Sequence, residues 1–240
     1  FDDEFIRYLN WRNFNDPYEW QWKDGRSRWD LLDVARMARA LRPNGIKWPY
    51  DSKGASTNRL ELLASINELS HDNAHDALSD VKATIGFAKL LKKSQPKLFE
   101  YLLEMRDKKK IASLVNSSQP FVYTSGKYDS ESEKTTIAIK LCDHPKKQGA
   151  IVYDLRYDPS EIIDLSPEEL VKKWQYDPEN PDEKLPLKTL LYNRCPAVSP
   201  LSVMDDESQK RLNITIDRTN SNTAKLSKAK NQLCKNVLKA

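Results

Sequence analysis

Residues 71–81 read HDNAHDALSDV and run directly into a helical pattern of apolar residues. This short stretch contains two histidines and three aspartates. It could be the capped start of a helix, a metal site, or one part of a catalytic centre whose other members lie elsewhere. The choice among these three hypotheses decides how the rest of the chain is interpreted.

The spacing within this stretch restricts its geometry. His75 and Asp80 are five residues apart, which on a continuous helix is a rotation of about 140°, so the two side chains would not share a face. They can converge only if His75 precedes the helix and Asp80 lies in its first turn. A zinc site would need more ligands, and only His71 is near. Alternatively, one of Asp72, Asn73 or Asp76 caps the helix and the histidines are surface residues.

The composition indicates an ordinary folded protein with clustered charge. The chain has 240 residues, 39% of them hydrophobic, which is enough to fill a core without disulfides. Its 39 basic and 35 acidic residues nearly balance, so overall charge is weak evidence for an anionic partner. Residues 89–110 hold eight basic and three acidic groups, and residues 211–240 hold seven basic groups against one acidic group. These two clusters favour an anionic partner more than the overall charge does.

The cysteines and the hydropathy pattern indicate the compartment. Cys142, Cys195 and Cys234 are odd in number and have no metal-binding spacing, which argues against a disulfide framework or a zinc ribbon. No apolar run approaches the roughly 18–20 residues of a membrane span, and no signal peptide is visible. We therefore expect a cytoplasmic protein without a membrane partner, and we further expect it to be a monomer.

The first half of the chain is predicted to be helical. Apolar periodicity, with Pro, Gly and Asn at the breaks, predicts helices over residues 4–14, 29–42, 59–69, 97–114 and from the 71–81 stretch to about 93. Residues 94–96 (Ser-Gln-Pro) should separate the last two helices. In the helix over 29–42, Arg36, Arg39 and Arg42 are expected on the exposed side.

The pattern changes after Ser117. Short β-branched runs in PFVYTSG, TTIAIKLCD and GAIVYDLRYD, separated by turn residues, predict a small antiparallel β unit. A helix is predicted over 166–174, followed by a strand in LKTLLYNRCP. The last thirty or so residues are predicted to form a helix, a loop and a basic helix.

Four tryptophans lie close together near the N-terminus, interleaved with basic residues. Trp11, Trp20, Trp22 and Trp29 fall within nineteen residues. Packing in a core is one interpretation. The other is a groove for single-stranded nucleic acid, because phosphates attract cations and unstacked bases stack on flat aromatic rings.

Several of these motifs occur together, in an order known from one enzyme family. The N-terminal FDDEF, the Arg59-Leu60 pair and the His75/Asp80 spacing resemble the DEDDh (DnaQ-like) family of 3′-to-5′ exonucleases. Longer segments resemble the exonuclease domain of one bacterial branch of that family, namely FDDEFIRYLNWRNFNDPYEWQW, SRWDLLDVARMARALRPNGIKWP, NRLELL and NAHDALSDVKATIGFAKLLKKSQPKLFEYLLEMRDK. HPKKQGAIVYDL and KTLLYNRCP look like the small Src-homology-three-like barrel that follows it.

The resemblance implies a fold of α/β class. Residues 1–93 would be the C-terminal, mostly helical part of a truncated RNase H-like exonuclease domain. Residues 94–240 would be a small α+β barrel-like (Src-homology-three-like) DNA-binding domain with a helical C-terminal end. Family members begin with a strand that carries an Asp-x-Glu pair, and nothing precedes Phe1 here. We therefore expect an internal fragment, without the first acidic motif and the C-terminal helical domain, that is inactive alone.

The resemblance also implies a reaction. The intact enzyme would hydrolyse single-stranded DNA from the 3′ end to nucleoside 5′-monophosphates, with two Mg²⁺ ions or Mn²⁺ in their place, during DNA repair and recombination. Asp80 would be a metal ligand, and Asp2 would be the second-motif carboxylate, acting on the metal through a water molecule. His75 would be the general base, a role that suits a side chain titrating near neutral pH.

Substrate contacts follow from the same resemblance. Arg59 matches a residue near the scissile end of the DNA. The other matching positions are Arg7, Tyr18, Trp22, Arg36 and Arg42 along the groove, Tyr101 and Lys108 on the following helix, and Lys188 and Asn193 in the barrel. For each of them a solvated charge or a packed aromatic ring is the alternative. Single-stranded DNA and single-strand-binding protein are the implied partners.

Two other hypotheses stay open from the residues alone. The chain could be a non-catalytic module that binds single-stranded nucleic acid, because it has the aromatic and basic residues but not the Asp-x-Glu motif. It could also be a metal-free structural domain in which 71–81 only caps a helix.

Overall fold

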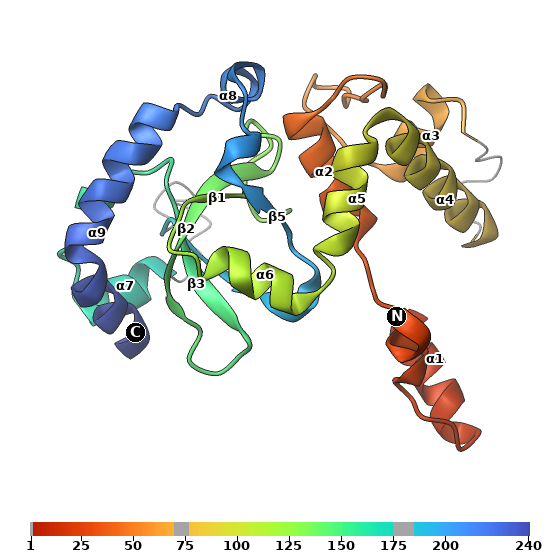
Figure 1. The fold of residues 1–240 in the computed structure, drawn as a ribbon, viewed down its shortest axis with the longest axis horizontal. Helices are drawn as coiled ribbons and strands as arrows, with labels where there is room; N and C mark the ends of the chain where they lie inside the picture. Colours follow the sequence, from red (N-terminus) through yellow and green to blue (C-terminus); the bar gives the residue numbers. More distant parts are fainter. Residues whose placement is uncertain (1, 70–76, 175–184) are drawn as a thin grey trace.

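The first part of the chain is helical, as predicted. The computed structural model describes residues 2–69, 77–174 and 185–240. The helices of this part are α1 (Asp2–Arg12), α2 (Leu31–Leu41), α3 (Leu60–Ile66), α4 (Ala77–Ser94), α5 (Pro96–Glu104) and α6 (Lys108–Val115). Figure 1 shows α2 to α5 grouped together, while α1 projects away from them. None of the helices in the described ranges is both long and apolar enough to cross a lipid bilayer.

One helix boundary differs from the prediction. The helix predicted over 97–114 is two helices, because α5 ends at Glu104 and α6 begins at Lys108. The side chain of Asp107 accepts a hydrogen bond from the backbone N–H of Lys109 at 2.8 Å and so caps a new helix. The predicted break at residues 94–96 is confirmed, and Pro96 occupies the first turn of α5, where its missing N–H costs nothing.

The second part is built on an antiparallel sheet, also as predicted. Its five strands lie in the order β4-β3-β2-β1-β5, and each pair of neighbours is antiparallel. The strands are β1 (Phe121–Thr124), β2 (Thr135–Asp143), β3 (Gly149–Asp154), β4 (Leu187–Leu191) and β5 (Ala197–Pro200). Among its described residues this part also contains the α-helices α7 (Pro167–Trp174), α8 (Asp206–Leu212) and α9 (Ile216–Lys239). The chain thus ends with the predicted helix, loop and long basic helix.

Strand β2 contains a bulge that changes which side chains face the core. Lys140 pairs with Val152, but Cys142 pairs with Ile151, so the register shifts between Lys140 and Cys142. A bulge inserts one extra residue and breaks the alternation of side chains along the strand. Both Leu141 and Cys142 therefore belong to the same hydrophobic cluster.

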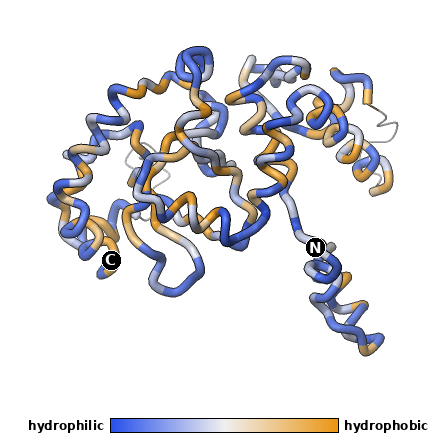
Figure 2. Tube along the Cα trace, viewed as in Figure 1, coloured by the Kyte–Doolittle hydropathy of each residue, from blue (hydrophilic) through white to orange (hydrophobic). Residues whose placement is uncertain are grey.

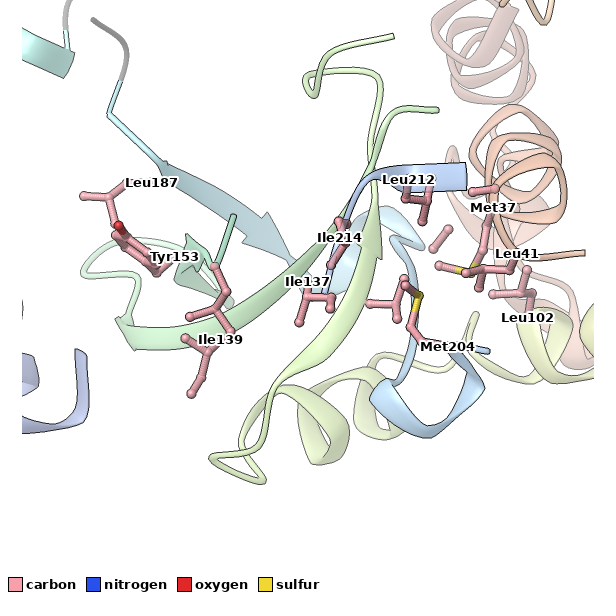
Figure 3. Close-up of a cluster of buried hydrophobic side chains, with 14 of the residues drawn as sticks. Met37, Leu41, Leu102, Ile137, Ile139, Tyr153, Leu187, Met204, Leu212 and Ile214 are labelled. Carbon is pink, nitrogen blue, oxygen red and sulfur yellow. The ribbon is translucent and has the colours of Figure 1, made fainter. Parts of the chain in front are cut away.

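The largest hydrophobic cluster joins the helical part to the sheet. It contains Met37 and Leu41 of α2, Ile137 and Ile139 of β2, and Leu226 of α9. Figure 3 shows the side chains of α2, of α5 and of the segment around α8 meeting those of β2 across this interface. A smaller cluster lies on the opposite face of the sheet, against α6.

The segment around α1 lies outside these clusters and exposes large apolar side chains. The side chain of Phe14 is fully exposed, and Trp11 and Tyr8 are each 67% exposed. Figure 2 shows hydrophobic positions along α1 where this segment projects from the rest of the chain.

Gly149, at the start of β3, has no room for a side chain. A Cβ atom built on it would lie 2.2 Å from the carbonyl oxygen of Leu190 on β4. We expect Gly149→Ala to lower the free energy of unfolding by about 1–3 kcal/mol, because the backbone of one strand must move. Urea denaturation measures this change. Gly86→Ala in α4 is the control, because its Cβ would lie at an ordinary contact distance of 3.7 Å from Leu69. Equal stability of the two variants would contradict the prediction.

Candidate nucleic-acid interface

The predicted catalytic residues lie at the N-terminal end of α4 and at the start of α1. Asp80 is half-buried in the first turn of α4, which begins at Ala77. This is the position that the five-residue spacing requires if Asp80 is to converge with a histidine that precedes the helix. His75 lies outside the described residues, as do His71, Asp72 and Asp76. Asp2 is the first residue of α1, and its side chain is also outside the described part.

The described side chains alone do not make a metal site. In ranges 2–69, 77–174 and 185–240 no group of three or more His, Cys, Asp or Glu residues could hold a metal ion. The carboxylate of Asp80 is a hard oxygen donor of the type that Mg²⁺ prefers, but it is a single ligand. The magnesium site therefore stays a prediction that depends on Asp2 and on the residues around His75.

The N-terminal segment brings together Arg7 and Tyr18, two of the predicted DNA-binding residues. The guanidinium carbon of Arg7 lies 5.0 Å from the centre of the Tyr18 ring. The two residues line a pocket of about 330 Å³ together with Glu4, Tyr8, Trp11 and Pro17. Trp22, further along the same segment, is 60% exposed. This segment thus offers cations and accessible aromatic rings side by side, which single-stranded nucleic acid requires.

The four tryptophans divide between the two interpretations of the sequence. Trp29 packs edge-on against Phe99, with 5.1 Å between ring centres, and so belongs to the core. Trp20 is half-buried and donates a hydrogen bond to the carbonyl of Pro17 at 3.0 Å. Trp11 and Trp22 are exposed by 67% and 60%, so core packing does not account for them in this structure.

Arg36 of α2 lies where the helical part meets the sheet. Its Nη1 is 2.6 Å from Oδ1 of Asp33, and a Cβ on Gly126, in the β1–β2 connection, would lie 2.8 Å from the same nitrogen. Burial raises the pKa of Asp33 and outweighs the opposing effect of Arg36. Because of the short distance to Nη1, the guanidinium of Arg36 occupies the space where a side chain on residue 126 would lie.

Arg42, at the C-terminal end of α2, also bridges two parts of the chain. It donates a hydrogen bond to the carbonyl of Val203 at 2.8 Å and pairs with Asp205 at 3.0 Å, at the start of α8. The predicted DNA contacts of Arg36 and Arg42 stay predictions, and DNA would compete with these protein partners for both side chains.

The expected exposure of Arg39 is wrong. Its side chain is 2% exposed and pairs with Glu133 at 3.0 Å between Nε and Oε2. It also donates hydrogen bonds to the carbonyls of Pro49 at 2.9 Å and Thr57 at 2.8 Å. A buried arginine needs such partners, and these come from a loop and from the β1–β2 connection. The helical periodicity could not show them, because none of them lies on the same helix.

Three other predicted contacts lie on the helices. Arg59, just before α3, is exposed and paired with Glu61. Tyr101 on α5 is half-buried and touches both hydrophobic clusters. Burial, with a smaller contribution from Glu104, raises the pKa of Tyr101 to about 12, so its hydroxyl stays protonated at neutral pH. Lys108 is exposed in the first turn of α6.

The remaining two contacts lie in the sheet domain. Lys188 on β4 donates a hydrogen bond to the carbonyl of Lys127 at 2.6 Å, and its Nζ lies 4.3 Å from the centre of the Tyr128 ring. Lys188 also lines a pocket of about 390 Å³ with Lys127, Lys173, Trp174, Leu185, Leu187 and Thr189. Asn193 is exposed in the short helix η5 (Tyr192–Arg194).

This lysine pocket was only partly foreseen, because the sequence prediction included Lys188 alone. Lys173 and Trp174 are adjacent in the chain, which is the same basic and aromatic combination found near the N-terminus. That combination is the one signal in the sequence that could have identified the pocket.

Comparisons with known proteins agree with this architecture. Residues 106–240 match the Exonuclease I SH3-like domain. Exodeoxyribonuclease I of Haemophilus influenzae is 43% identical over 234 residues, which cover 94% of this chain and 49% of that protein. The chain belongs to the exodeoxyribonuclease I family. The chain spans about half the length of the curated relatives that it matches.

Solved structures give the same result. The structure of Escherichia coli Exonuclease I in complex with a dT13 oligonucleotide matches with a TM-score of 0.90 and 36% identity, over 98% of this chain and 53% of that chain. An ExoI/SSB-Ct complex matches with a TM-score of 0.88 and 36% identity, over all of this chain and 52% of that chain. The expected fold, an exonuclease-type helical part followed by an SH3-like domain, is confirmed.

Proposed function

We propose that this chain is part of a 3′-to-5′ exonuclease that hydrolyses single-stranded DNA to nucleoside 5′-monophosphates in DNA repair and recombination. Membership of the exodeoxyribonuclease I family supports a nuclease role. The observation that carries the proposal is the position of Asp80 in the first turn of α4, together with the place of His75 five residues earlier in the sequence.

Each predicted catalytic residue has a distinct role in this proposal. Asp80 and Asp2 would hold two Mg²⁺ ions, with Mn²⁺ as an alternative, because carboxylate oxygens suit both ions. When bound, the metal ions supply a site that activates the attacking water and stabilises the leaving 3′-oxygen. His75 orients the attacking water and accepts its proton. The first turn of α4 fixes the position of Asp80 relative to the core beneath it.

The exposed aromatic and basic residues support single-stranded DNA as the substrate. Tyr18 and Trp22 are 54% and 60% exposed, so bases could stack on them. Arg7 beside Tyr18 and the lysines around Lys188 could hold phosphates. The neighbouring Escherichia coli structure is a complex with a dT13 oligonucleotide, which agrees with this substrate.

A second partner is suggested by one of the neighbours. Because a solved relative is an ExoI/SSB-Ct complex, we propose single-strand-binding protein as a partner of this chain. Titration of a fluorescent peptide with the C-terminal sequence of that protein measures the interaction. A scrambled peptide of the same composition is the control.

Stacking on Trp22 gives a testable effect on DNA affinity. We expect Trp22→Ala to weaken binding of a labelled oligo-dT by about 1–3 kcal/mol, the usual contribution of one base stacked on an aromatic ring. Fluorescence anisotropy on the 240-residue chain at several salt concentrations measures both the affinity and its salt dependence. Phe14→Ala is the matched control, because Phe14 is also an exposed aromatic residue of this segment but is not among the predicted DNA-binding positions. Equal losses from the two variants would argue against a specific stacking site.

Binding without cleavage is the second candidate function. The pocket of Lys127, Lys173, Trp174 and Lys188 favours it, because a basic and aromatic pocket can hold a nucleotide without any metal ion. Replacement of the matching half of the Haemophilus influenzae relative by this chain gives a protein of full length in which cleavage can be measured. Metal-dependent release of nucleotides supports the nuclease, whereas DNA binding without release supports the binding module.

A further inference from the structure

Two cysteines that are far apart in the sequence meet in the fold. Cys142 on β2 is 6% exposed, and Cys234 on α9 is half-buried, and both pack in the largest hydrophobic cluster. Helix α9 packs against β2, Cys234 is near enough to contribute to the raised pKa of Cys142, and neither cysteine is in a disulfide. Their spacing in the sequence gave no indication of this pairing.

The bulge in β2 creates the pairing. With regular alternation, Cys142 would lie on the same face as Ala138, which belongs to the cluster under α6. The register shift between Lys140 and Cys142 instead turns Cys142 to the face of Ile139 and Leu141. Helix α9 packs against β2 on that face and supplies Cys234.

Polar anchors hold α9 in place on both sides of the pair. The side-chain amide of Asn222 donates a hydrogen bond to the carbonyl of Leu155 at 2.9 Å, and that of Asn236 donates one to the carbonyl of Leu165 at 2.9 Å. Leu233, next to Cys234, is fully buried. These contacts fix α9, and with it Cys234, against the face of the sheet that carries Cys142.

We propose that Cys142 and Cys234 are a reversible dithiol–disulfide pair which, when oxidised, ties α9 covalently to β2. The oxidant is a small disulfide such as oxidised glutathione. The Cys234 thiolate attacks it, forms a mixed disulfide and releases one glutathione thiolate. Cys142 then loses its proton and attacks the sulfur of Cys234, which releases the second glutathione. In total the protein loses two protons and two electrons, and the glutathione disulfide is reduced to two thiols.

The environment of Cys142 sets the speed of the second step. Burial, assisted by the neighbouring Cys234, raises the pKa of the Cys142 thiol to about 12. Only the thiolate attacks a disulfide, and burial still opposes loss of the Cys142 proton in the mixed disulfide, so closure should accelerate as the pH rises from 7 to 9. The inference does not depend on nuclease activity, since it rests only on the packing of α9 against β2.

The test uses the folded 240-residue chain with Cys195→Ser, which removes the third free cysteine. After treatment with oxidised glutathione under native conditions, we expect both remaining thiols to be lost, no glutathione to be retained, and a peptide linking Cys142 to Cys234 in a non-reducing digest. With Cys142→Ala or Cys142→Ser added, Cys234 should keep its glutathione, because no thiol is left to displace it. Two variants are used because the hydroxyl of serine in the core could disturb folding, which circular dichroism would reveal.

Three outcomes would overturn the proposal. The first is a stable glutathione adduct on Cys234 although Cys142 is present. The second is a Cys142–Cys234 disulfide that forms only in denaturant. The third is a rate of closure that does not change between pH 7 and pH 9, which the thiolate requirement does not allow.

Discussion

His75→Ala is expected to lower the rate of single-stranded DNA cleavage by about 10²–10⁴-fold, the usual contribution of a general base. The reason is that His75 is the residue to which the proposal assigns the proton of the attacking water. The measurement is kcat in the protein of full length in which this chain replaces the matching half of the Haemophilus influenzae relative. DNA affinity should not change, because the predicted contacts with DNA lie elsewhere. Asp80→Asn should reduce kcat at least as much, since it removes a charged metal ligand.

Two controls accompany this experiment. His144 lies just after β2 and accepts a hydrogen bond from the backbone N–H of Lys146, so His144→Ala should leave kcat unchanged. Glu68→Gln is the control for Asp80→Asn, because it also replaces a carboxylate by an amide. Glu68 is exposed and pairs with Lys47 at 3.4 Å. Full activity of His75→Ala or Asp80→Asn would show that the catalytic assignment is wrong.

Arg39→Met is expected to lower the free energy of unfolding by about 3–5 kcal/mol, the usual effect of removing one partner of a buried ion pair. The variant leaves Glu133, whose side chain is only 14% exposed, without its positive partner. It also removes the donor from the carbonyls of Pro49 and Thr57. Urea denaturation monitored by tryptophan fluorescence measures the change.

Arg59→Met is the matched control for this prediction. Arg59 also pairs with a glutamate, but its side chain is 69% exposed, so its loss should cost no more than about 1 kcal/mol. Addition of Glu133→Gln to Arg39→Met should restore part of the stability, because the unpaired buried charge is then gone. Equal effects of Arg39→Met and Arg59→Met would show that burial of the pair contributes nothing.

Much of the fold could be predicted from the sequence, because local signals determine it. Apolar periodicity and the break at residues 94–96 located the helices, β-branched runs located the first three strands, and LKTLLYNRCP located β4. The division of the predicted helix at Asp107 was missed, because the apolar pattern continues across an aspartate that caps a new helix. Local signals thus defined the elements but not every boundary between them.

The features that the sequence did not reveal depend on residues distant along the chain. The burial of Arg39 depends on carbonyl and carboxylate partners from residues 49–57 and from Glu133. The meeting of Cys142 with Cys234 depends on a bulge, which no alternation pattern shows. Among the predicted DNA-binding residues, Arg7 and Tyr18 are in contact, whereas Arg36 and Arg42 bridge the helical part and the sheet domain.

The hydrophobic cluster shared by α2, α5, the sheet and α9 has a consequence for how the chain unfolds. Because this one cluster contains Met37 at one end and Val237 at the other, the helices cannot lose their packing while the sheet keeps all of its own. Residues from α2 to α9 should therefore unfold in one cooperative transition, and the segment around α1, which exposes its apolar side chains, should contribute little to it. A bond that stabilises α9 against β2 would then also slow amide hydrogen exchange in α2, at the opposite end of the same core.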